Sequence, residues 1–342
     1  MGTATNLPTI RLICIGMRHA FFAFPSTHFY IDRERMQRNL MTKSRMRLST
    51  PRVFDFLRTI YSHGWCSLPP FEVNKSDGSL TLAVRLREGV LALCVLRGAT
   101  DAVEVSIESA SPLSAAQKSE IRTIIANCLR LNDDLDEFYR IAARHPGFRW
   151  IPKAGAGRLL RAQTVFEDVV KMICTTNCSW ALTESMVGNL TTKLGESPGH
   201  GRFAFPTPQA IAATSDSFLR KHIRAGYRSP YILEFATSVA EGTLDVESWR
   251  TSTLPTEELF KQVKSVKGMG DYAAGNILKL IGRYDYLGLD SWVRSRYYQL
   301  HSRGRKVNDT TIEKHYASLG TWRGLFFWLE MTRYWYDEKF PF

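Results

Sequence analysis

The chain has 342 residues, of which 44% are hydrophobic and 23% charged, a composition typical of a globular protein with a sizeable buried core. Its 45 Lys and Arg exceed its 33 Asp and Glu by 12, which favours a polyanionic partner: nucleic acid first, an anionic membrane surface second. Because no run of about eighteen apolar residues occurs, the sequence excludes a membrane span. Half of the basic excess lies in residues 1–50, so bulk charge alone is a weak argument.

Residues 1–49 are Arg-rich and lack an apolar core followed by a small-residue cleavage site. They predict a basic, disordered extension or an over-long gene start, in preference to a transit peptide. The six cysteines form no CxxC pair and no Cys/His cluster with zinc spacing, a pattern that suits a reducing compartment. No cysteine follows Cys178, which excludes an iron-sulfur cluster from the C-terminal region.

Residues 50–135 predict an antiparallel sheet domain. Apolar side chains in FDFLRTIY have helical spacing, and Pro69 and Pro70 stop that helix. Three short, partly alternating runs separated by turn residues predict strands at 80–86, 89–96 and 102–109. The period then changes to 3.6 for a helix over 115–129, with Ser114 as its N-cap.

Residues 136–342 predict a mostly helical body in two lobes. Helical segments punctuated by Gly- and Pro-rich loops are expected at 162–174, 179–195, 208–223, 229–242, 256–266, 271–282, 291–300, 311–320 and 323–335. The fold class is therefore α+β, with the sheet at the N-terminal side.

The segment with the most candidate functional residues is SVKGMGDYAAGNILKLIGRYDYLGLDSW. Gly268, Met269 and Gly270 join two helices so tightly that backbone N–H groups are exposed at the second helix, where they favour a phosphate. An ordinary helical hairpin is the alternative interpretation. Asp290, which follows that helix, favours the phosphate site. Asp271 and Asp285 are competing carboxylates that capping or solvent exposure explains better.

From Phe54 to Trp335 the sequence resembles the helix-hairpin-helix DNA glycosylases, and its motifs are most similar to those of their 8-oxoguanine branch. The resemblance is carried by the hairpin with Asp290 and, in chain order, by SHGWCSLPPF, MICTTNCSWALTESMVGNLTTKLG and FPTPQAIAATSDSFLRKHIRAGYRSPYI. It implies an enzyme that flips a damaged base out of duplex DNA and cleaves its N-glycosidic bond.

The resemblance implies that Asp290 is the catalytic carboxylate, which stabilises positive charge on the sugar and orients the attacking water. An aspartate before SWVRSRY is also a good helix N-cap, and the two roles are compatible. Where the 8-oxoguanine branch has a Schiff-base lysine, this chain has Tyr272, which cannot form an imine. Lys264, Lys267 and Lys279 are expected to differ from Tyr272 in helical phase, so a monofunctional hydrolase is expected.

The resemblance also implies a base pocket formed by Tyr272, Asn276, Phe327 and Met331. An apolar, aromatic pocket of this kind discriminates by stacking and suits electron-poor, alkylated purines. Some aromatic residues in FFWLEM must instead belong to the core.

DNA contacts are implied for Asn177, which fills the gap left by the flipped nucleotide, for the wedge Tyr227 with its neighbour Arg228, and for the hairpin residues Gly268, Met269 and Gly270. The family also implies a monovalent cation, K+ or Na+, on the hairpin carbonyls of Lys264, Val266 and Met269; no other cofactor is expected.

The expected partner is damaged double-stranded DNA, bound by a monomer and without a membrane. The expected location is cytoplasmic, with the nucleoid, in a bacterium and nuclear in a eukaryote. Two alternatives stay open: a bifunctional 8-oxoguanine-type glycosylase and lyase with a displaced lysine, and a non-catalytic DNA-binding protein.

Overall fold

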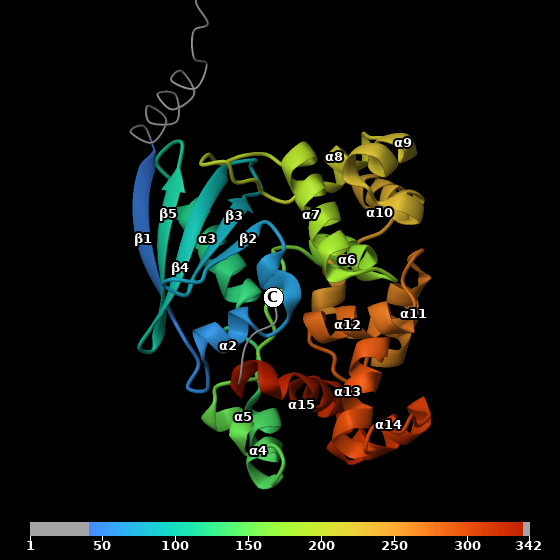
Figure 1. The fold of residues 1–342 in the computed structure, drawn as a ribbon. Helices are drawn as coiled ribbons and strands as arrows, with labels where there is room; N and C mark the ends of the chain where they lie inside the picture. Colours follow the sequence, from blue (N-terminus) through green and yellow to red (C-terminus); the bar gives the residue numbers. More distant parts are fainter. Residues whose placement is uncertain (1–40, 338–342) are drawn as a thin grey trace, which may run out of the picture. The chain divides into compact units, whose positions relative to one another are not determined.

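The computed structural model describes residues 41–337, which form an α+β fold with the sheet at the N-terminal side (Figure 1). The sheet is antiparallel with the order β1-β5-β4-β3-β2. Its strands are β1 (Thr42–Ser49), β2 (Phe71–Asn74), β3 (Ser79–Arg85), β4 (Leu91–Ala99) and β5 (Ala102–Ser109). The three predicted strands are confirmed, and β1 and β2 are additional.

Strand β1 corrects the domain boundary that the sequence predicts at residue 49. It pairs with β5 along its length, from Thr42 opposite Ser109 to Ser49 opposite Ala102. Its basic side chains alternate with Ser44, Met46 and Leu48, so the charges point outward while Leu48 is buried. A count of charges conceals this alternation. Residues 1–40, the rest of the predicted extension, lie outside the described residues.

Helix α3 (Ala115–Cys128) begins at the predicted cap. The Ser114 hydroxyl accepts the N–H of Gln117 at 3.2 Å, and the Gln117 side chain accepts the N–H of Ser114 at 2.9 Å. Ile121 and Ile125 on its inner face are fully buried in the main core. The predicted change from strand to helical periodicity at this point is confirmed.

The helical part follows the predicted segments, with some additions and divisions. Helices α4 (Asp136–Arg144) and α5 (Trp150–Lys153) and the short 3₁₀ turns η1 (Gly64–Ser67), η3 (Gly226–Arg228) and η4 (Glu247–Thr251) were not predicted. The segment 208–223 is divided into α8 (Pro208–Ala212), α9 (Asp216–Phe218) and a π-helical turn, η2 (Leu219–Ile223), and the segment 311–320 is divided between α14 (Asp309–Tyr316) and η5 (Ala317–Trp322). None of the described helices is both long and apolar enough to cross a membrane. The elements are α2 (Phe56–Ile60), η1 (Gly64–Ser67), α4 (Asp136–Arg144), α5 (Trp150–Lys153), α6 (Val165–Thr175), α7 (Trp180–Leu194), α8 (Pro208–Ala212), α9 (Asp216–Phe218), η2 (Leu219–Ile223), η3 (Gly226–Arg228), α10 (Ser229–Ala240), η4 (Glu247–Thr251), α11 (Thr256–Ser265), α12 (Asp271–Ile281), α13 (Ser291–His301), α14 (Asp309–Tyr316), η5 (Ala317–Trp322) and α15 (Arg323–Asp337).

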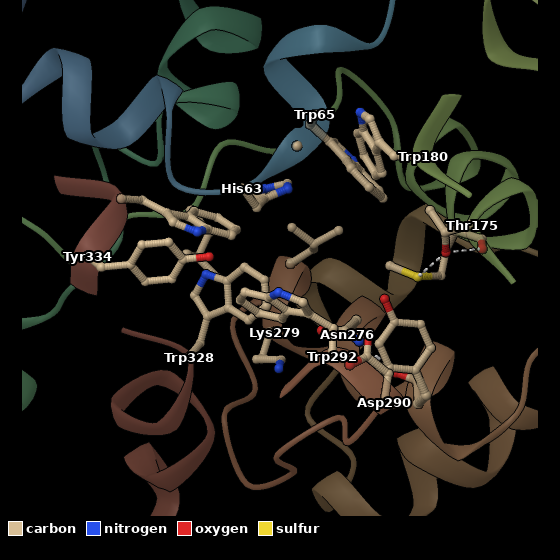
Figure 2. A pocket seen from close by; sticks show the side chains of 16 residues that line it. His63, Trp65, Thr175, Trp180, Asn276, Lys279, Asp290, Trp292, Trp328 and Tyr334 are labelled. Carbon is tan, nitrogen blue, oxygen red and sulfur yellow. Dashed lines mark hydrogen bonds between the residues drawn. The ribbon is translucent and has the colours of Figure 1, made fainter. Parts of the chain in front are cut away.

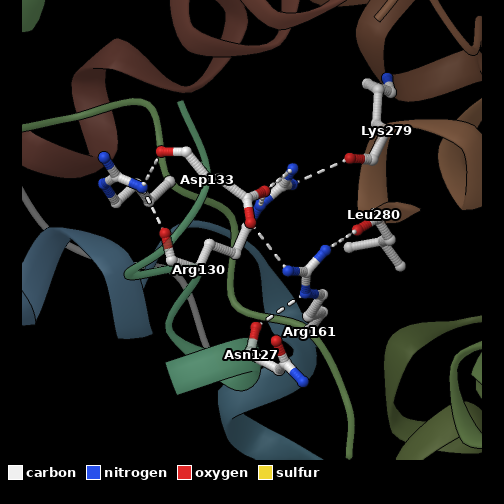
Figure 3. Close-up of polar contacts among 7 residues, drawn as sticks. Asn127, Arg130, Asp133, Arg161, Lys279 and Leu280 are labelled. Carbon is white, nitrogen blue, oxygen red and sulfur yellow. Dashed lines mark hydrogen bonds and ion pairs between the residues drawn. The ribbon is translucent and has the colours of Figure 1, made fainter. Parts of the chain in front are cut away.

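Two buried arginines bind the C-terminal end of α12: Arg130, which follows α3, and Arg161, which precedes α6 (Figure 3). Arg130 donates to the backbone carbonyl of Lys279 at 3.0 Å, and Arg161 to that of Leu280 at 3.3 Å. Asp133 accepts from both guanidinium groups, at 2.7 and 2.9 Å. The last carbonyls of a helix lack intrahelical partners and carry its negative dipole end, so this pair of cations stabilises α12 where it ends.

Candidate active site

A cavity of about 420 Å³ opens between the sheet domain and the helices, a volume typical of ligand sites (Figure 2). Sixteen residues line it, and five of them are tryptophans: Trp65, Trp180, Trp292, Trp328 and Trp335. The rings of Trp292 and Trp335 have centroids 5.5 Å apart, and those of Trp328 and Trp335 are 5.7 Å apart. The walls are therefore mainly flat, polarisable surfaces suited to stacking.

Asp290 lies in the wall of this cavity and is the N-cap of α13. Its Oδ1 accepts the backbone N–H of Val293 at 2.8 Å. The predicted cap and the predicted position at the site are thus combined in one side chain, because a capping aspartate is held at the start of a helix in a defined orientation. Neither Asp271 nor Asp285 is among the lining residues; Asp271 is exposed and pairs with Lys264 at 2.6 Å.

Tyr272 and Asn276 occupy the same face of α12 and also line the cavity. The phenol of Tyr272 lies near the carboxylate of Asp290 and the hydroxyl of Thr175. Burial, together with the negative charge of Asp290, raises the pKa of this phenol, so it remains protonated at neutral pH. The Asn276 amide donates to the Tyr272 carbonyl at 2.9 Å.

Lys279 is a third lining residue of α12, and here the expectation of a different helical phase is wrong. Seven residues separate it from Tyr272, which is two helical turns, so both side chains project from one face. Its Nζ donates to the Leu287 carbonyl at 2.7 Å, within the loop that leads to Asp290. Burial lowers its pKa to about 7, although the charge of Asp290 opposes this shift.

The sheet domain contributes His63, Gly64 and Trp65 to the opposite wall. Trp65 Nε1 donates to Asp168 Oδ1 at 2.8 Å, and His63 Nε2 contacts the Leu160 carbonyl. Both rings are therefore held by partners that do not line the cavity. Burial lowers the pKa of His63 to about 4, which keeps the imidazole neutral at ordinary pH. A Cβ on Gly64 would lie 2.4 Å from the Trp180 ring, so this close approach requires glycine.

The two DNA-intercalating candidates lie together outside the cavity. Asn177 is exposed, has a φ of 47°, and its amide donates to the Tyr227 hydroxyl at 3.4 Å. Tyr227 is 46% exposed. Arg228 corrects the prediction of a DNA contact: it is 3% exposed, donates to the Thr176 carbonyl and stacks 4.4 Å from the Tyr227 ring. It holds the two exposed residues in place.

The hairpin between α11 and α12 has the predicted tight turn. Gly268 has a φ of 88°, and a Cβ there would meet the Tyr231 ring at 2.9 Å, whereas Gly270 faces open space. No backbone hydrogen bond described for residues 41–337 ends on the carbonyl of Lys264 or Met269, as a cation ligand requires, but the Val266 carbonyl accepts the Met269 N–H at 3.0 Å. The Met269 side chain itself is buried.

The chain was compared with known proteins, and no family model matches it. It is 23% identical over 247 residues to a probable N-glycosylase/DNA lyase of Methanothermobacter thermautotrophicus, covering 64% of this chain and 78% of the relative. The 3-methyladenine DNA glycosylase of Archaeoglobus fulgidus has a TM-score of 0.68 at 19% identity, covering 86% of this chain and 99% of its own. The 8-oxoguanine glycosylase/lyase of Clostridium acetobutylicum has a TM-score of 0.66 at 17% identity, covering 85% and 98%. The chain has the helix-hairpin-helix DNA glycosylase fold.

Within this glycosylase fold, the prediction of base-pocket residues is wrong for two positions. Phe327 and Met331 are completely buried in the main core and do not line the cavity. Helix α15 instead presents Trp328, Tyr334 and Trp335 to it. The side chains of Trp328 and Trp335 are seven residues apart and so share a face, which the run of aromatics in the sequence does not distinguish from the core face.

The sequence also contained signals for the lining residues that were missed. Trp65, Trp180 and Trp292 each lie within a segment that carried the glycosylase resemblance: SHGWCSLPPF, MICTTNCSWALTESMVGNLTTKLG and the hairpin segment that ends in DSW. Lys279 could have been found from its i, i+7 spacing to Tyr272. His63 lies in the same segment as Trp65, but nothing in the sequence distinguishes it as a lining residue.

Proposed function

We propose that the chain is a DNA N-glycosylase of base excision repair that flips a damaged base into the tryptophan-lined cavity and hydrolyses its N-glycosidic bond. One observation carries this proposal. Asp290 joins two features, since it caps α13 at the end of a hairpin–helix unit and its carboxylate lies in the wall of a base-sized aromatic cavity. The glycosylase fold and the name of the curated relative support the same activity.

In the proposed reaction, the base departs with the bonding electrons and the sugar acquires oxocarbenium character. The Asp290 carboxylate lies where it stabilises that positive charge and accepts a proton from the attacking water. The Val293 N–H holds the carboxylate in orientation, and Tyr272 lies in the same cavity wall without a covalent role. His63 and Trp65 close the opposite wall and exclude bulk water from it.

The substrate that best suits this cavity is a cationic, alkylated purine. Five indole rings offer π-faces, which attract cations, and the neutral imidazole of His63 adds no opposing charge. The test is a panel of duplexes that each contain one lesion, with base release measured under single-turnover conditions. Release of 3-methyladenine or 7-methylguanine well above that of 8-oxoguanine is expected; the reverse order would contradict the substrate assignment.

We further propose that base release proceeds without a covalent sugar intermediate. By the resemblance, Tyr272 stands where the 8-oxoguanine branch has its lysine, and a phenol cannot form the imine. Lys279 favours the alternative of lyase activity, because it is an amine of lowered pKa in the cavity wall. However, its Nζ is directed to the Leu287 carbonyl. Borohydride trapping on a lesion duplex decides, since a trapped enzyme–DNA adduct requires the imine.

For the DNA interface, we propose that Asn177 fills the vacated position in the duplex, that Tyr227 wedges the strand, and that the Gly270 N–H side of the hairpin grips a phosphate. The open space beside Gly270 and the exposure of the other two side chains support this assignment. A monovalent cation would be held by the carbonyls of Lys264 and Met269, which accept no described backbone hydrogen bond, and would supply positive charge beside the phosphate.

A further inference from the structure

Lys279 is a buried amine in a wall otherwise made largely of aromatic rings. It is 2% exposed, and its Nζ lies 2.7 Å from the Leu287 carbonyl oxygen and 5.4 Å from the centre of the Trp328 ring. No ion pair described for residues 41–337 includes it. Its ammonium form has three N–H donors, for which the Leu287 carbonyl is one acceptor. It also lies near the Trp328 ring, which itself lines the cavity (Figure 2).

The groups around this amine favour opposite charge states. Asp290, at the start of α13, favours the ammonium, whereas burial favours the neutral amine. Arg130 binds the backbone carbonyl of Lys279, and its own charge is paired with Asp133. His63, before η1, is neutral, and Tyr272 on α12 and Tyr334 on α15 are phenols. Burial outweighs the attraction of Asp290, and the pKa of Lys279 falls to about 7. The cavity wall thus changes its charge in the neutral range.

We propose that Lys279 determines which charge of base the cavity accepts: its ammonium form opposes a cationic base, and its neutral form admits one. This inference rests on the proposed glycosylase function. A cationic purine that stacks on Trp328 in this cavity of about 420 Å³ would lie near the same ring as the Lys279 Nζ. Two positive charges beside one ring repel each other at close range. A neutral purine of the same shape experiences no such penalty.

The test compares two bases that differ in charge and hardly in shape. Duplexes carry the 2′-fluoro-2′-deoxyriboside of 3-methyladenine, which is cationic, or of 3-deaza-3-methyladenine, its neutral isostere. The fluorine opposes oxocarbenium formation, so affinities are measured without turnover. In wild type, the preference for the cationic base should increase on the order of tenfold as the pH rises from about 6 to about 8, because Lys279 loses its proton in this interval.

Three variants complete the test. Lys279→Met keeps an aliphatic side chain but removes the charge, so its preference for the cationic base should be high and independent of pH. Lys279→Arg keeps a positive charge, so its preference for the cationic base should stay low at every pH tested. Lys118→Met, at an exposed position of α3, is the matched control and should behave as wild type. If Lys279→Met retains the wild-type pH dependence, the inference is wrong although the glycosylase proposal stands. If neither lesion is bound above undamaged DNA, both proposals are wrong.

Discussion

The phenol of Tyr272 and the carboxylate of Asp290 line the same cavity, and the negative charge of Asp290 adds to burial in raising the pKa of the phenol. The pair brings the first turn of α12 close to the N-cap of α13, although the rest of α12 and the loop that contains Leu287 separate them in sequence. Lys279 donates to the Leu287 carbonyl in that loop.

We predict that Asp290→Asn abolishes base release while the fold and DNA binding are retained. The amide keeps the shape and most of the capping ability but loses the charge that stabilises the sugar cation. Single-turnover excision should fall on the order of a hundredfold to a thousandfold. Asp285→Asn, in the same loop but outside the cavity, is the control. If the Asp290 variant excises as fast as wild type, the carboxylate is only a helix cap.

Tyr272→Lys is predicted to introduce covalent chemistry. The new amine would stand beside Asp290 in a buried position, where desolvation lowers its pKa and favours the nucleophilic form. Borohydride should then trap the variant on lesion DNA but leave wild type and Tyr272→Phe untrapped. A trapped wild type would instead contradict the monofunctional proposal, and loss of trapping in a Lys279→Met variant would identify that amine as the nucleophile.

Gly270→Val is predicted to weaken binding to every duplex by about tenfold, because its side chain would occupy the space through which a phosphate reaches the N–H groups of α12. A φ of −79° allows valine there, so the melting temperature should change little. Gly188→Ala, in α7, is a control that also faces open space. Unchanged affinity in a salt titration would remove the hairpin from the interface.

Trp292→Ala is predicted to reduce the preference for lesion DNA over undamaged DNA. The indole is 37% exposed at the cavity and stacks near Trp335, and loss of one base–aromatic contact costs about 1–3 kcal/mol. Leu300→Ala, at an exposed position of the same helix, should change neither affinity. Equal loss of affinity for lesion and undamaged duplexes would place Trp292 on the DNA backbone instead of the base.

His63 should make the free energy of unfolding depend on pH. Its pKa is about 4 in the folded chain against an ordinary value of 6.5, so between these values the unfolded chain binds the additional proton. Stability should therefore fall as the pH is lowered from about 6.5 to about 4, by about 3 kcal/mol in total. Denaturant titrations of His63→Gln should lack this component, whereas His222→Gln, at an exposed position, should retain it.

Periodicity predicted the elements that carry their own pattern, and the resemblance to the helix-hairpin-helix glycosylases singled out Asp290, Tyr272 and Asn276, which the structure brings together in one cavity wall. Strand β1 was missed because its basic side chains dominate a count of charges, although every second residue faces inward. Phe327 and Trp328 illustrate the limit for the site: adjacent aromatics lie on different faces, and only packing determines which one enters the core. Arg228 was misassigned for the same reason, because its burial arises from the Thr176 loop, far away in sequence.

The contact from Arg130 to the Lys279 carbonyl joins the sheet domain to a residue that lines the cavity. Loosening of one domain would therefore remove the cap from α12 and leave two guanidinium groups without their buried acceptors, at a cost of several kcal/mol. The two domains are thus coupled in their unfolding and should melt in one cooperative transition. A helical fragment expressed without the sheet would lose both a wall of its cavity and the end of its central helix.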